Sequence, residues 1–210
     1  MSLVEAPHTN PPSHIRSLVS HPFEPLQEVD IKFLIMKVDF LMDITSARWI
    51  SDLGALLARE PFISFFEDGV VLRLDPTFVP KVSSAFPRGQ EVILPALVSP
   101  VGSTDGFPWE LLDLKRALQV YLAVSSSFRK SDSLFVSFGS SSKGSKASLS
   151  TISRWIKQLI LLFYSLAGAS PPVGIQGRYT RGISASWAEF GGVSVAEICR
   201  AATWAAPDTF

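Results

Sequence analysis

The chain has 210 residues, of which 47% are hydrophobic and 11% aromatic, with 19 basic and 19 acidic side chains. This composition predicts a globular core and excludes a disordered chain. The single cysteine, Cys199, excludes an internal disulfide framework and a cysteine-rich zinc site. No apolar run is long enough to span a bilayer, so we expect a soluble intracellular protein without a membrane partner.

The charges are distributed unevenly along the chain. Residues 1–114 carry 8 basic and 15 acidic side chains, whereas residues 115–210 carry 11 and 4. The C-terminal half therefore has a net charge of +7. This asymmetry favours an anionic partner. The alternative is a neutral globule whose helices merely sort their charges.

The N-terminal residues are rich in proline and histidine and show no periodicity. We predict that residues 1–24 are a flexible leader or linker and that residues 25–210 form one domain. All three histidines lie within the first 21 residues. The domain itself therefore cannot hold a Ser-His-Asp site or a histidine-based metal site. We expect no cofactor.

Apolar spacing predicts helices and a small sheet in the N-terminal half. The helices are expected over residues 29–42 and 46–58. Strands are expected over residues 62–66, 69–74 and 91–95, the first two forming a hairpin through the turn at residues 67–69. The expected fold is mainly helical α+β, a helical body with a small antiparallel sheet.

The C-terminal half is predicted to be mostly helical. A helix follows Pro108 and Trp109, a short strand covers residues 135–138, and the longest helix covers residues 148–166. A final helix pair begins near Arg181. Gly191 and Gly192 separate its members, and Ser194 with Glu197 forms a capping box for the second helix, which runs to about residue 204.

A loop rich in serine, glycine and lysine covers residues 139–148. It superficially resembles a phosphate-binding loop, but it lacks the four-residue spacer before Gly-Lys-Ser/Thr that such a loop requires. We therefore interpret it as a solvated loop. Its two lysines, Lys143 and Lys146, and two cations on the following helix, Arg154 and Lys157, are candidate contacts to a DNA backbone.

Three stretches resemble the catalytic domain of the tyrosine recombinase (phage integrase) family, in the form found in Ngaro- and DIRS-type retroelements. They are TSARWISDL at residues 45–53, RYTR at residues 178–181 and GVSVAEICRAATW at residues 192–204. The resemblance covers residues 25–210. It implies a nuclear protein that binds double-stranded DNA for recombination and integration, without a metal. In this family a tyrosine attacks a phosphodiester while two arginines stabilise the developing charge.

The resemblance assigns roles to individual residues. Arg181 matches the second arginine, Trp204 matches the late His/Trp position, and Lys81 is the candidate general acid that protonates the leaving hydroxyl. An ordinary surface lysine remains the alternative for Lys81.

Three departures predict that catalysis is lost. The first arginine is expected where Trp49 stands, and on a helix its neighbour Arg48 would point about 100° away, which makes it a weak substitute. Arg178 replaces the expected histidine and cannot shuttle protons near neutral pH. The nucleophilic tyrosine is expected some residues after Trp204, beyond Phe210. We therefore expect a decayed or truncated copy of a mobile element.

Two alternatives remain open from the sequence. One is a DNA-binding module without catalysis that uses the basic C-terminal half. The other is a helical protein-interaction domain without a nucleic-acid role. Because family members exchange their C-terminal segment between protomers, a homo-oligomer formed through an apolar groove would belong to this second alternative.

Overall fold

The computed structural model describes residues 13–79, 91–97, 106–177, 179–190 and 192–202. Within these residues the helices are α1 (Ser13–Arg16), α2 (Ile31–Ser46), α3 (Ile50–Leu53), α4 (Leu114–Ser126), α5 (Leu149–Leu166), α6 (Tyr179–Phe190) and α7 (Val195–Ala202). Short 3₁₀ turns are η1 (Ser17–Val19), η2 (Trp109–Leu112) and η3 (Ser140–Ser142). The strands are β1 (Ile63–Phe66), β2 (Gly69–Leu72) and β3 (Val92–Pro95). The predicted class, helices with a small antiparallel sheet, is confirmed.

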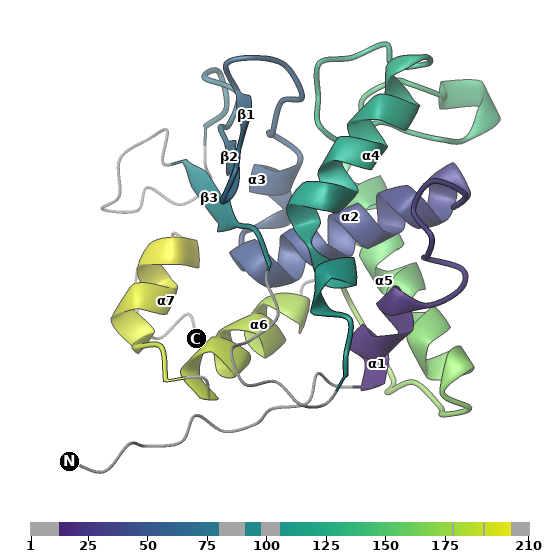
Figure 1. Cartoon of the computed structure of the whole chain (residues 1–210), viewed down its shortest axis with the longest axis vertical. Helices are drawn as coiled ribbons and strands as arrows, with labels where there is room; N and C mark the ends of the chain where they lie inside the picture. Colours follow the sequence, from purple (N-terminus) through teal and green to yellow (C-terminus); the bar gives the residue numbers. More distant parts are fainter. Residues whose placement is uncertain (1–12, 80–90, 98–105, 178, 191, 203–210) are drawn as a thin grey trace.

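Helix α2 is the centre of the fold (Figure 1). It packs against α4, α5 and α6, and every residue from Leu34 to Asp43 is buried. The Asp30 carboxylate caps its first turn by accepting a hydrogen bond from the Lys32 amide. Ala47, in the left-handed region at φ 49°, ends it. The helix predicted over residues 29–42 is thus confirmed and extends one turn further.

The three strands form the antiparallel sheet β1-β2-β3 beside the helical body (Figure 1). Val70 pairs with Phe65 on one side and with Leu94 on the other, and Val70 and Leu94 are buried. Gly69 lies so close to β3 that a Cβ atom would come within 2.5 Å of the Leu94 carbonyl oxygen. The predicted hairpin and third strand are confirmed.

Two predicted elements are wrong. The helix expected over residues 46–58 is reduced to the single turn of α3, and the chain then forms isolated bridges from Leu56 to Leu74 and from Leu57 to Ser133. The strand expected over residues 135–138 is also absent from the described residues, where Val136 makes one bridge to Lys146. Apolar spacing marked these residues correctly as core, but their tertiary partners chose their backbone conformation.

The region expected to be a flexible leader is partly built into the core. Ile15, Leu18 and Phe23 are buried in the main hydrophobic cluster, so residues 13–24 belong to the fold. Residues 1–12 lie outside the described part of the chain.

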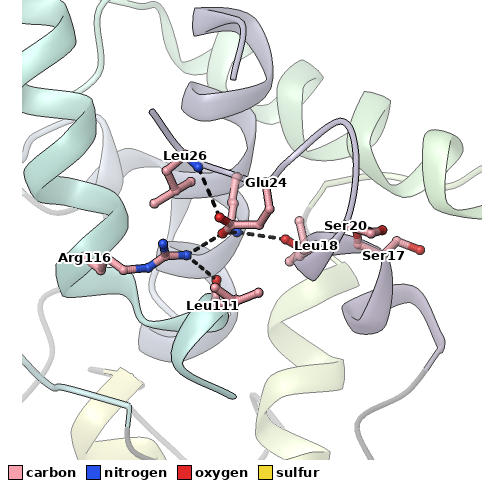
Figure 2. Close-up of polar contacts among 8 residues, drawn as sticks. Ser17, Leu18, Ser20, Glu24, Leu26, Leu111 and Arg116 are labelled. Atoms are coloured by element: carbon pink, nitrogen blue, oxygen red, sulfur yellow. Dashed lines mark hydrogen bonds and ion pairs between the residues drawn. The ribbon is translucent and has the colours of Figure 1, made fainter. Parts of the chain in front are cut away.

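An ionic cluster ties this N-terminal segment to the helices (Figure 2). The Lys37 ammonium of α2 donates to Glu24 Oε1 at 2.5 Å and to the Leu18 carbonyl at 2.8 Å. Arg116 of α4 also donates to Glu24, and the Leu26 amide donates to Glu24 Oε2 at 3.1 Å. Glu24 is therefore the shared anchor of the segment.

The C-terminal helices form a small corner against the end of α2 (Figure 1). The predicted capping box is confirmed: the Glu197 amide donates to Ser194 Oγ at 3.3 Å, and the Ser194 amide donates to Glu197 Oε2 at 3.1 Å. A second cluster of small buried side chains, separate from the main core, holds the corner together; its members are Ala47, Ala185, Ile198, Cys199 and Ala202.

Candidate functional site

Arg181 of α6 lies over the indole ring of Trp49. The guanidinium carbon is 3.6 Å from the ring centroid, which is close cation–π stacking. Trp49 takes up the extended position that precedes α3, and its side chain is 40% exposed. The stack therefore fixes a cation at the edge of the surface, where the last turn of α2, α3 and α6 meet.

Two carboxyl groups lie within electrostatic range of this arginine. Burial lowers the pKa of Arg181, while Asp43 of α2 and Asp52 of α3 act in the opposite direction. Burial likewise raises the pKa of Asp52, and Arg48 opposes that shift. The site thus contains two arginines and two acids whose charges depend on one another.

Arg48 and Trp49 are neighbours with opposite exposure. Arg48 is only 3% exposed, and its Nη2 donates to the Glu91 carbonyl at 3.4 Å. Burial lowers the pKa of its guanidinium. The two residues lie in the link between α2 and α3, not on one helix, so their side chains are not related by the helical rotation expected from the sequence. Arg48 is directed inwards, and Trp49 meets Arg181.

The other residues assigned from the resemblance cannot be placed beside this pair. Lys81, Arg178 and Trp204 lie outside the described residues. Of the predicted catalytic set, the described part of the chain therefore shows Arg181 and Arg48.

The four cations expected to contact a DNA backbone are all exposed. Lys143 and Lys146 lie in the loop before α5, and Lys143 Nζ is 4.7 Å from the centroid of the Phe128 ring. Lys146 lines a groove of about 520 Å³ that Ser51 of α3 also lines. Arg154 and Lys157 lie on the solvent side of α5. Lys146 and the Trp49–Arg181 pair therefore both adjoin α3.

A buried acid that the sequence reasoning missed holds α6 in place. The Thr180 hydroxyl, next to Arg181, makes a hydrogen bond with Asp43 Oδ2 and lies 2.5 Å from the Gly177 carbonyl oxygen. Burial raises the pKa of Asp43 to about 7, against the opposing effects of Thr180 and Arg181. The sequence holds a signal for it: Asp39 and Asp43 are spaced one turn apart within the mostly apolar stretch from Leu34 to Ile44.

An apolar groove of about 250 Å³ opens beside the same helices. Its walls come from α1, α2, η2, α5 and α6, and include Phe40, Phe163 and Ile183. Ile183 is 47% exposed. Thr180 also lines the groove, whose surface is predominantly apolar.

The described residues contain no group of three or more histidine, cysteine or acidic side chains that could hold a metal ion. No helix among them is long and apolar enough to cross a membrane. No protein-family model matches the sequence, and a comparison with curated proteins finds no match.

Proposed function

We propose that this protein is a tyrosine-recombinase-like domain that binds the phosphodiester backbone of double-stranded DNA in the nucleus, with a role in recombination and integration. The observation that supports this most directly is the stacking of Arg181 on Trp49. A guanidinium held by an aromatic ring loses little freedom when it binds a phosphate, and its planar fork matches two phosphate oxygens.

The same contact argues against catalysis by this chain. Trp49 stands where the resemblance places the first catalytic arginine, and the neighbouring Arg48 is buried with its guanidinium on a backbone carbonyl. The transition state of strand transfer needs two cations on the non-bridging oxygens. With Arg48 buried, the described residues place only Arg181 at the surface of this site, an arrangement that suits phosphate binding better than stabilisation of that transition state.

The proposal is tested by fluorescence anisotropy with a labelled duplex over a range of salt concentrations. Affinity should fall steeply with salt because phosphate contacts release counterions. Arg181→Ala should weaken binding to all sequences similarly and reduce the salt slope by about 1.

Arg59→Ala is the matched control. Arg59 also stacks on a ring, Phe62, at 4.7 Å, and is exposed, but it lies outside the Trp49–Arg181 site. Equal effects of the two substitutions, or no binding at low salt, would contradict the proposed function. A covalent protein–DNA adduct on a nicked substrate would contradict the proposed loss of catalysis.

A second candidate function is homo-oligomerisation through the apolar groove, favoured by its exposed wall on α6. Sedimentation should then show concentration-dependent association without DNA, and Ile183→Glu should abolish it. Val124→Glu is the control, because Val124 is 41% exposed on α4 and does not line the groove. A monomer at all concentrations would exclude this function.

A further inference from the structure

At the contact between α2 and α6, a single hydroxyl proton is available for two hydrogen bonds. Thr180 Oγ1 is within hydrogen-bonding distance of two oxygens, Asp43 Oδ2 and the Gly177 carbonyl. A hydroxyl group has one proton to donate, and a carbonyl has none. If the Asp43 carboxyl were ionised, one of these close oxygen–oxygen contacts would have no proton. A protonated Asp43 resolves this, because it donates to Thr180, which then donates to Gly177.

The surroundings of Asp43 also favour the neutral acid. Its carboxyl group is buried, and its Oδ1 has no hydrogen-bond partner among the described residues. An ionised carboxylate in such a place would lose its hydration without gaining enough donors.

The charged groups around Asp43 come from three elements. Arg181 of α6 is the cation that acts on it directly, and this cation is shared with Asp52 of α3. Asp39, one turn earlier on α2, is buried, and both its oxygens are without partners in the described residues. Beyond it, Asp39 faces Tyr121 of α4. Asp52 also has Arg48 beside it, so Arg181 is the one cation in the described residues that opposes the raised pKa of Asp43.

We propose that Asp43 is a proton-operated latch: in its protonated form it docks α6 onto α2 through Thr180, and loss of that proton releases α6 together with Arg181. The latch closes because the acid proton completes the chain from Asp43 to Thr180 to Gly177. It opens when the ionised carboxylate gains more from water than from this buried position.

The direction of the pH effect follows from proton binding in the two states. Docked α6 keeps the pKa of Asp43 near 7 through burial, whereas undocking exposes the acid to water and returns its pKa toward the ordinary value of 3.8. The docked state therefore binds more protons between these values. Undocking becomes more frequent as the pH rises through this window and levels off above about pH 7.

The latch can be measured without DNA, by amide hydrogen exchange in α6. After correction for the intrinsic pH dependence of exchange, the opening constant of α6 should rise by about 10- to 100-fold between pH 5 and pH 8. In Asp43→Asn the side-chain amide replaces the acid proton as donor to Thr180. Exchange in this variant should stay slow and independent of pH.

Two other variants keep the test decisive if Asp43→Asn folds poorly. Thr180→Val removes the relaying hydroxyl and should raise opening at pH 5 toward the wild-type value at pH 8, whereas Thr180→Ser should retain the pH dependence. Asp39→Asn is the matched control, a buried acid on the same helix without a contact to Thr180, and should also retain it. A pH-independent wild type, or the same pH dependence in Asp43→Asn, would overturn the latch.

The consequence for phosphate binding rests on the proposed function. Because Arg181 follows Thr180, the DNA affinity of the wild type should be higher at pH 5.5 than at pH 8. Part of this pH effect should disappear in Asp43→Asn. Protonation of the N-terminal histidines affects the wild type and Asp43→Asn equally, so it cancels when the two proteins are compared. If the amide exchange of α6 depends on pH as expected but DNA does not bind, the latch is supported and the proposed function is contradicted. If DNA binds but the amide exchange of α6 does not change with pH, only the latch is contradicted.

Discussion

Lys37 and Asp43 lie on the same buried helix, six residues apart, and their charges are accommodated in different ways. Lys37 is fully buried, yet it donates to Glu24 at 2.5 Å and to the Leu18 carbonyl at 2.8 Å. Burial lowers the pKa of Lys37 to about 8, so the side chain is still mostly charged at neutral pH. Asp43 is also buried, but its side chain has one hydroxyl partner, Thr180, and the electrostatic attraction of Arg181, which Asp52 shares.

The difference shows what a buried charge needs. Around Glu24, each of the three charged side chains has partners of the opposite charge or backbone oxygens (Figure 2). Lys37 therefore stays mostly charged although it is buried. Around Asp43 the donors are too few, so the acid favours its neutral form. The first arrangement fixes the N-terminal segment at neutral pH, whereas the second makes the attachment of α6 depend on pH across the neutral range.

Breaking the Glu24 cluster should have the largest effect. Glu24→Ala leaves the Lys37 ammonium buried beside the Arg116 guanidinium without an anion, and should reduce the free energy of unfolding by about 3–5 kcal/mol. Urea denaturation followed by circular dichroism measures this. Glu91→Ala is the control, because its ion pair with Arg73 is exposed, and should cost at most about 1 kcal/mol. Equal losses would mean that the cluster is no stronger than a surface pair.

The second largest effect should be on how the free energy of unfolding depends on pH, and it should come from Asp43. Because the pKa of Asp43 is about 7 in the folded protein, its contribution to stability is complete below the unfolded value near 3.8 and is lost as the pH rises toward 7. The wild type should therefore lose about 1.4 kcal/mol per pH unit more than Asp43→Asn between pH 5 and 6.5. Urea denaturation at each pH gives the difference. Parallel curves for the two proteins would show that Asp43 is not protonated in the fold.

The smallest effect should come from the capping box of α7. Ser194→Ala removes the side-chain acceptor for the Glu197 amide and should destabilise α7 by about 1 kcal/mol. Faster amide exchange confined to α7 would show that this corner opens independently of the Glu24 cluster. Ser126→Ala is the control, since that hydroxyl only bonds back to the Ala123 carbonyl of its own helix. Faster exchange throughout the protein would instead mean that the corner and the core unfold together.

Short-range features of the fold could be predicted from the sequence. The capping box at Ser194, the hairpin turn at residues 67–69 and the helix that begins after Ser148 each depend on residues a few positions apart. Their geometry is set by local hydrogen bonding and by apolar periodicity, both of which are visible in the sequence. The helical body with a small antiparallel sheet followed from these elements.

The contacts that decide the site span long stretches of chain. Thr180 is 137 residues from Asp43, and Arg116 is 92 residues from Glu24. The isolation of Arg48 from solvent and the contact of Arg181 with Trp49 also depend on how α2, α3 and α6 pack. A side chain's charge and availability are set by burial and by partners that only the folded chain brings together. The sequence by itself therefore determined where an arginine and two acids stand, and the tertiary structure decided which of them face the solvent and which hold a proton.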